Sequence, residues 1–464
     1  MKWASPILFF LVMTLNAYAL INSNLVADWQ AGVGITASGG LISQWNDQHQ
    51  LLNNDGITNN LTQTSATFQP YDMTDAQGYR GVMFPWAFGS AHPNDYLNIP
   101  NTLTGLNTTN MTVYVVATGP VDQERSETLI WFNGSSGWIR FFLAGTYPAY
   151  YPTSLAVGPQ TSTFYPPLNR AVFVGSGNNV TTTLRWNNVT STNAPQTATA
   201  LVNGGTVAVN SGAISGGSEY GYSGIVYRIL VYKAAHTAAQ MDAQVSELSA
   251  LYGVLTNYTK QAVCRGDSIT EGVDSTLLQN YPFQLCERYP EIEWRNQGIG
   301  GLKIGTNGEA GTMYVIDGNF VDPLYDGTLQ QNWLLFFGGV NDMNSDGLTG
   351  AATYGRLTNY VAARKAARPW KVIACTVQAT VQSSGHPEKN AQYNSCIRTN
   401  AGGWDGFVDP GLNSPIETRL DDYTNTNYFD SDGLHLINAG YAVFADHFGQ
   451  VVNVPHRTTG FFGP

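Results

Sequence analysis

QAVCRGDSIT, residues 261–270, opens an alternation of apolar strand-like runs and helical stretches in the C-terminal part of the chain. Such an alternation predicts a parallel sheet covered by helices on both faces. Functional residues of these sheets collect at the carboxyl ends of the strands. After the first run come a helix over 277–289, IEWRNQGIGG (292–301), NWLLFFGGVND (332–342), a helix over 354–367, KVIACTVQAT (371–380), a helix over 390–401 and WDGFVDP (404–410).

Four short motifs in this part carry the residue types of nucleophilic catalysis. Ser268 lies in Gly-Asp-Ser-Ile directly after a strand, where a turn can present its hydroxyl and backbone N–H outward. Gly301 ends a glycine-rich segment whose amides can approach a ligand, and the Asn341 amide can donate to an oxyanion. Asp432 precedes His435 by three residues, so its carboxylate can hold Nδ1–H and leave Nε2 as a base.

Each motif taken alone has a structural alternative. Gly-Asp-Ser is common in turns and helix caps, the glycine segment can be a plain turn, and Asn-Asp can be one as well. The glycine segment is not a dinucleotide-binding motif, because Lys303 replaces the third glycine of G-x-G-x-x-G. His386, His447 and His456 have no carboxylate at that spacing, so they are expected at the surface, with His386 a candidate for the pocket rim.

In combination, the four motifs resemble those of the GDSL/SGNH hydrolase family. The resemblance implies serine-dependent ester hydrolysis, in which Ser268 attacks the ester carbonyl, His435 accepts its proton and Asp432 orients the imidazole. The backbone amides of Ser268 and Gly301 and the side chain of Asn341 would form the oxyanion hole. No metal or organic cofactor is expected, because no ligand spacing such as C-x-x-C is present.

The resemblance extends over roughly residues 260–450 and implies a flavodoxin-like three-layer α/β fold with a parallel sheet. Residues 256–455 are accordingly assigned to an SGNH/GDSL hydrolase domain and residues 456–464 to a C-terminal tail. The serine motif departs from the family only in having isoleucine where leucine is usual. Gly300 stands beside Gly301 and is the alternative source of the second oxyanion amide.

Length and charge point to a second domain of another kind. The chain has 464 residues and a net charge of −11, which argues against a nucleic-acid or anionic-membrane partner. A chain of this length predicts two domains or more. Residues 1–255 contain 12 acidic and 8 basic side chains, whereas residues 256–464 contain 21 and 14 and all four cysteines. This break in composition predicts two differently built domains.

Short runs of aromatic and β-branched residues alternate with turn residues in the first part, which predicts an all-β antiparallel sandwich or jelly roll. The layout resembles the concanavalin-like (laminin-G/lectin-type) jelly roll over residues 20–255, and the resemblance implies glycan binding. The few charges and the absence of a triad in this part predict a targeting role and no chemistry. The runs lie at 112–118, 128–132, 138–144, 170–175 and 197–204, before a strand and helix in 222–254. Aromatic residues that could stack on sugars or form the core are Trp29, Trp45, Trp86, Trp131, Trp138 and Trp186.

The N-terminus has the features of a signal peptide over residues 1–19. Lys2 precedes the apolar run ILFFLVMTL (7–15), which is too short to cross a bilayer, and Ala17-Tyr18-Ala19 gives a cleavage pattern. A buried strand or helix is the alternative. We expect a secreted, extracellular protein without a membrane span. Asn-x-Ser/Thr sequons, which fit a secreted glycoprotein, begin at Asn60, Asn107, Asn110, Asn133, Asn179, Asn188 and Asn257.

The four cysteines leave the redox state open. Secretion favours disulfides, and four cysteines allow three pairings, among which the sequence does not choose. Two of them fall in predicted central strands, where buried free thiols are common. The cysteines are Cys264, Cys286, Cys375 and Cys396.

The favoured function is a secreted esterase that removes acyl groups, above all O-acetyl, from a polysaccharide or other glycan. One alternative is a general lipase or acyl esterase. The other is a non-catalytic glycan-binding or adhesion protein with a vestigial hydrolase fold. Acyl-chain preference distinguishes the two kinds of esterase, and an intact set of serine, histidine and oxyanion residues argues against the vestigial alternative. The sequence leaves the oligomeric state open.

Overall fold

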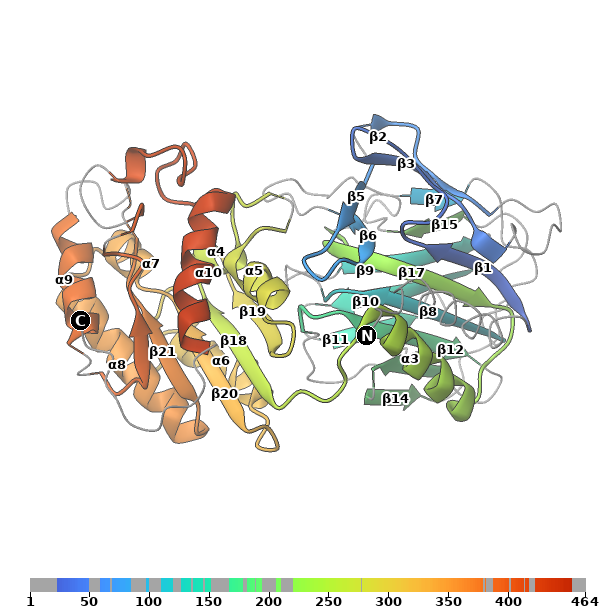
Figure 1. Cartoon of the computed structure of the whole chain (residues 1–464). Helices are drawn as coiled ribbons and strands as arrows, with labels where there is room; N and C mark the ends of the chain where they lie inside the picture. Colours follow the sequence, from blue (N-terminus) through green and yellow to red (C-terminus); the bar gives the residue numbers. More distant parts are fainter. Residues whose placement is uncertain are drawn as a thin grey trace, which may run out of the picture.

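In the part of the chain that it describes, the computed structural model contains two sheets of different kinds, one in the N-terminal region (before residue 256) and one in the C-terminal region (Figure 1). The first has 17 strands, paired antiparallel except that β16 runs parallel to β9 among the strands described. The second has five parallel strands in the order β19-β18-β20-β21-β22. The structure describes residues 23–49, 59–66, 69–84, 97–99, 110–119, 127–134, 137–144, 147–151, 167–177, 182–187, 189–193, 206–209, 220–276, 278–378, 380, 387–399, 402–412, 414–416 and 422–452.

Three adjacent strands form the centre of the N-terminal sheet: β8 pairs with β12 on one side and with β17 on the other. Because side chains alternate along a strand, Val113 and Val115 of β8 enter one buried cluster, whereas Tyr114 and Val116 enter another. The sheet consists of β1 Leu25–Gln30, β2 Ile35–Ser38, β3 Leu41–Trp45, β4 Leu61–Thr62, β5 Tyr71–Thr74, β6 Arg80–Phe84, β7 Leu97–Ile99, β8 Met111–Ala117, β9 Glu127–Gly134, β10 Gly137–Ala144, β11 Tyr147–Tyr151, β12 Ala171–Gly177, β13 Thr182–Trp186, β14 Val189–Asn193, β15 Thr206–Val209, β16 Tyr220–Gly221 and β17 Gly224–Tyr232.

Helix α3 (Ala238–Tyr252) follows β17 and covers the second cluster, which confirms the strand and helix predicted over 222–254. The Thr237 side chain caps its first turn, and Gly253, at a φ of 59°, ends it in the left-handed conformation. The buried face of α3 presents Met241, Val245 and Leu248 to the sheet. Tertiary packing of this face therefore fixes the helix on the sheet.

The tryptophans of the N-terminal region are core residues where the structure describes their side chains. Trp29 and Trp45 are fully buried and Trp186 nearly so, which excludes them as exposed sugar-stacking platforms. Four predicted runs are found as β8, β9, β10 and β12. Trp86, the side chains of Trp131 and Trp138, the run at 197–204, the predicted signal peptide and the tail at 456–464 lie outside the described residues.

The C-terminal sheet confirms the predicted alternation of strands and helices, with helices drawn on both sides of it in Figure 1. Helix α5 begins later than the predicted residue 277, because Asn280 caps its first turn by accepting from the Phe283 amide at 2.9 Å. No helix among the described residues is long and apolar enough to cross a membrane. The elements are β18 Lys260–Gly266, α4 Ser268–Glu271, α5 Tyr281–Arg288, β19 Glu293–Gly298, α6 Met313–Phe320, β20 Gln331–Phe336, α7 Val340–Ser345, α8 Gly350–Ala367, β21 Lys371–Cys375, α9 Pro387–Arg398, β22 Gly406–Val408 and α10 Asn438–Val452.

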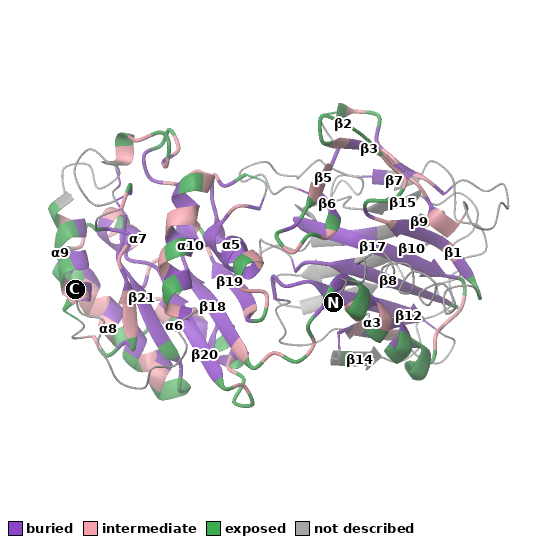
Figure 2. Cartoon of the chain, viewed as in Figure 1, coloured by how far each residue is buried: buried purple, intermediate pink, exposed green. Residues whose placement is uncertain are grey.

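The two regions share buried contacts along β19, the edge strand of the parallel sheet. The Leu168 amide donates to the Trp294 carbonyl at 2.8 Å, and Asn169 accepts from the Trp294 amide at 2.8 Å. Asn169 also donates to the Ile292 carbonyl at 2.9 Å. Figure 2 shows the buried strands of both sheets. The N-terminal region thus covers an edge that would otherwise present unpaired peptide groups.

All four cysteines are free thiols. Cys264 and Cys375 are buried in β18 and β21, as their places in the sequence predicted. Cys286 is buried in α5, and Cys396 is half-buried in α9.

Candidate active site

Ser268 is the first residue of α4, a single helical turn at the carboxyl end of β18. Asp267 caps this turn by accepting from the Ile269 amide at 3.1 Å. Burial raises the pKa of Asp267 to about 7, against the lowering effect of that amide, and the neighbouring Asp342 raises it further. The turn leaves Ser268 half-buried at the sheet edge where active residues collect.

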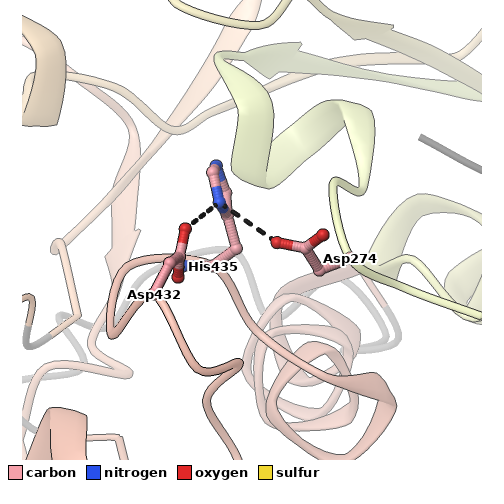
Figure 3. Close-up of side chains that lie close together, drawn as sticks. All are labelled: Asp274, Asp432 and His435. Atoms are coloured by element: carbon pink, nitrogen blue, oxygen red, sulfur yellow. Dashed lines mark hydrogen bonds and ion pairs between the residues drawn. The ribbon is translucent and has the colours of Figure 1, made fainter. Parts of the chain in front are cut away.

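His435 lies between the carboxylate of Asp432 and the hydroxyl of Ser268. Its Nδ1 is 2.6 Å from Asp432 Oδ2, and its Nε2 is 2.9 Å from Ser268 Oγ. Figure 3 shows the first of these contacts. The structure therefore brings together the serine, histidine and aspartate that the motifs singled out.

Asp432 is fixed by its own loop. Its Oδ1 accepts from the amides of Leu434 at 2.8 Å and His435 at 2.9 Å. Partial burial raises the pKa of Asp432, but the two amides and the imidazole outweigh it, so its pKa lies below the usual value. The carboxylate is therefore ionised and can accept from Nδ1–H.

The glycine segment after β19 passes beside Ser268. A Cβ added to Gly300 would lie 4.0 Å from the Ser268 Cβ and 2.7 Å from Glu271 Oε2. A Cβ added to Gly301 would meet nothing within 4 Å, although its φ of 73° favours glycine. Gly300 thus adjoins the serine, whereas Gly301 borders open space.

Asn341 is the second residue of α7 and is half-buried. Its Nδ2 donates to the Leu302 carbonyl at 3.0 Å, which ties the start of α7 to the segment after Gly301. The side chain does not cap its own helix. Asn341 therefore lies in the first turn of a helix and not in an Asn-Asp turn, and its side-chain amide points to the neighbouring loop.

Asp342 has a positioning contact that the sequence motif did not reveal. It is fully buried and accepts from the amides of Ile304 at 2.8 Å and Gly305 at 3.2 Å and from Arg356 at 2.8 Å. Burial raises its pKa, against the lowering effects of Arg356 and the two amides. The residue after Asn341 therefore anchors the loop that the asparagine contacts.

Asp274 is the second residue that sequence reasoning missed. Its Oδ2 lies 3.3 Å from His435 Nδ1, the same ring nitrogen that contacts Asp432, and it approaches this nitrogen from the other side (Figure 3). Burial raises its pKa, and His435 opposes that shift. Its position in the turn six residues after Ser268 was the available signal, but no motif marks it.

Donor atoms of Asp274, Asp432 and His435 lie within 4.8 Å of one another, a spacing that could hold a metal ion. The imidazole nitrogen that faces both carboxylates is the one already bonded to Asp432. Metal binding would therefore compete with the contact to Asp432.

The other three histidines of the C-terminal region lie apart from this site or outside the part of the chain that the structure describes. His447 is half-buried in α10, where burial lowers its pKa, and His386 and His456 lie outside the described residues.

Solved structures with similarity to this chain include several esterases. A carbohydrate acetylesterase family member from Sinorhizobium meliloti is 18% identical, covers 42% of this chain and 97% of its own, and has a TM-score of 0.33. A lipolytic protein of the G-D-S-L family from Veillonella parvula is 20% identical. The match covers 42% of this chain and 100% of that protein, with a TM-score of 0.34. An aryl esterase from M. smegmatis is 14% identical. The match covers 42% of this chain and 98% of that protein, with a TM-score of 0.33.

No curated protein matches the sequence. Residues 264–443 match the GDSL-like Lipase/Acylhydrolase family. This match begins in β18 and ends in α10, so it includes every residue of the site described above. The C-terminal region therefore contains a GDSL-type hydrolase domain, and the protein is a serine carboxylic ester hydrolase.

Proposed function

We propose that the protein is a secreted esterase that removes O-acetyl groups from a carbohydrate, with Ser268, His435 and Asp432 as its catalytic triad. The contacts of 2.9 Å from Ser268 Oγ to His435 Nε2 and 2.6 Å from His435 Nδ1 to Asp432 are the observation that supports the proposed triad. Ser268 Oγ attacks the ester carbonyl while Nε2 takes its proton, then returns it to the leaving alcohol. Water releases the acyl group by the reverse path.

The oxyanion hole in this proposal consists of the backbone amides of Ser268 and Gly301 and the Asn341 side chain. The position of Ser268 at the start of α4 supports it, because amides at a helix start lack intrahelical acceptors. The Asn341 amide has two hydrogens, and the bond to the Leu302 carbonyl uses only one of them. The open space beside Gly301 leaves room for the substrate oxygen.

The proposal of a carbohydrate substrate is based on the antiparallel region that is joined to the hydrolase domain. We propose that residues 20–255 form a concanavalin-like jelly roll that binds glycan, preceded by a signal peptide over 1–19. A linked binding domain raises the local substrate concentration at residues 256–455. Because Trp29, Trp45 and Trp186 are buried, glycan binding requires other side chains.

Acetate release from acetylated polysaccharides tests the proposal, with short- and long-chain aryl esters assayed in parallel. We expect acetate release and no turnover of long chains, and we expect Ser268→Ala to abolish both polysaccharide and aryl acetate hydrolysis. Preference for long chains would identify a lipase instead. Wild-type activity in a folded Ser268→Ala protein would rule out the proposed triad.

A further inference from the structure

Asp274 places a second carboxylate at the imidazole nitrogen that Asp432 already engages (Figure 3). The side chains of Asp274 and Asp432 are 34% and 35% exposed, whereas that of His435 is 16% exposed. Neither carboxylate is therefore the single buried partner of the histidine. The histidine lies between two carboxylates of equal exposure, at 3.3 and 2.6 Å.

The loop that carries Asp274 is bonded on both sides of this residue to α10, the helix that begins three residues after His435. These bonds fix the loop against the segment of the histidine, so the short distance to Nδ1 follows from the fold. The Tyr441 hydroxyl donates to the Val273 carbonyl at 2.5 Å, Asn438 Oδ1 accepts from the Thr276 amide at 2.8 Å, and Asn438 Nδ2 donates to Thr276 Oγ1 at 2.8 Å.

The backbone of Asp274 has a φ of 63°, in the left-handed region that non-glycine residues rarely adopt. Such a conformation persists where the surrounding structure imposes it, and it is concentrated at functional sites. Here Val273 is buried in the apolar cluster that contains Tyr227 of the N-terminal region, and Ser275 donates to the Gly272 carbonyl at 2.7 Å. The residues flanking Asp274 thus hold its backbone in place.

We propose that Asp274 is a positioning residue that shares the Nδ1–H of His435 with Asp432. This inference rests on the proposed role of His435 as the base. A carboxylate on either side of Nδ1 favours the tautomer that carries its proton there and leaves Nε2 free to accept from Ser268. When Nε2 takes that proton, both carboxylates stabilise the resulting imidazolium.

The two carboxylates predict an unusual response to Asp432→Asn. In a triad with one carboxylate, this change costs about 10⁴ in kcat, because the amide favours the wrong tautomer. With Asp274 at 3.3 Å, the correct tautomer persists, and we expect a loss of only about 10²-fold. Asp274→Asn alone should lower kcat by about tenfold, since Asp432 remains at the shorter distance.

The test compares kcat, KM and melting temperature of the full chain on an aryl acetate for Asp274→Asn, Asp432→Asn and the double variant. Asparagine tolerates the left-handed conformation, so Asp274→Asn should leave the fold intact. We expect the double variant to lose about 10⁴ in kcat, more than the product of the single losses, at unchanged KM and melting temperature. Asp274→Gly, which suits the same φ, should reproduce the loss seen with Asp274→Asn.

Asp446→Asn is the matched control, because this carboxylate is exposed on α10 and pairs with Arg288. It should not change kcat. The inference is overturned if Asp432→Asn alone costs about 10⁴ and the double variant is no worse, or if Asp274→Asn and Asp274→Gly both leave kcat unchanged. Activity in Ser268→Ala would instead overturn the proposed function, so the two failures can be told apart.

Discussion

Asn341 combines an observed structural bond with the oxyanion role that we propose for its side chain. Its amide donates to the Leu302 carbonyl at 3.0 Å, and its backbone lies in the first turn of α7. In the free protein, this bond orients the side chain before any substrate arrives. Asp342 anchors the same loop from the next position, through the amides of Ile304 and Gly305. The two residues therefore fix the loop after Gly301 from one helix start.

Asn341→Ala should lower kcat by about 10²–10³ while KM stays nearly constant, because the oxyanion develops only in the transition state. The lost bond to Leu302 should cost about 1 kcal/mol of unfolding free energy at most. Steady-state kinetics and thermal unfolding of the same purified variant check both expectations. A variant that is destabilised yet fully active would show that the side chain is structural.

At the scale of elements, the end of β19 packs directly against α4. A Cβ added to Gly298 would lie 2.0 Å from the Glu271 amide nitrogen and 2.4 Å from the Thr270 carbonyl carbon. Both contacts are with backbone, so no side chain can move aside. Glycine at this position therefore allows the turn that contains Ser268 to lie at the carboxyl end of β18.

Gly298→Ala should displace α4, cost about 1–3 kcal/mol of unfolding free energy through overpacking, and lower kcat by misplacing Ser268. Urea unfolding and kcat on an aryl acetate measure the two effects. Gly355→Ala in α8 is the control, because its added Cβ would meet nothing within 4 Å. This second change should stabilise the protein by about 0.5–1 kcal/mol at normal turnover. Equal effects of the two substitutions would contradict this account.

Asp267, which caps α4, makes the unfolding free energy of the protein depend on pH. Its pKa of about 7 in the folded protein, raised mainly by burial, exceeds the ordinary value of 3.8. The folded state therefore binds the proton more tightly than the unfolded state, and unfolding free energy falls as pH rises from about 4 to 7. Asp267→Asn removes this penalty, so its melting temperature relative to the wild type should be higher at pH 8 than at pH 5. Differential scanning calorimetry at both pH values tests this, and a difference independent of pH would refute it.

At the scale of the whole molecule, the N-terminal region is packed against the hydrolase domain through more than a linker. Leu168 is fully buried within the apolar core of the C-terminal sheet, and Phe283 of α5 belongs to the cluster under α3. Asn169 satisfies peptide groups of Trp294, Ile292 and Pro290 at the edge of this sheet. Stability of the two regions should therefore be coupled.

Asn169→Ala should lower the unfolding free energy by about 1–3 kcal/mol, because it leaves buried peptide groups of the edge strand without partners. Thermal unfolding checks the shift. Asn110→Ala is the control, since Asn110 also bonds two backbone groups, at Lys233 and Ala235, but in an exposed position. It should change stability by less than about 0.5 kcal/mol. Similar losses for both variants would contradict a special role for the buried edge.

Local order in the sequence predicted much of this molecule. The apolar runs at 262–264 and 333–337 predicted buried parallel strands, because such strands lack the alternation of a half-exposed sheet. The spacing of Asp432 and His435 predicted their contact, since three residues suffice to close one turn. Ser268 could be placed beside them only through the family resemblance, as 167 residues separate it from the histidine.

The tertiary structure alone decided which distant groups meet. Asp274 reaches His435 through bonds of its loop to α10, and no periodicity in its own segment records them. The tryptophans at 29, 45 and 186 could not be assigned to core or surface, because aromatic residues serve in both. The coverage of β19 by Asn169 likewise depends on residues more than a hundred positions apart. Spacing along the chain determines local contacts, whereas contacts between distant segments depend on how whole elements pack.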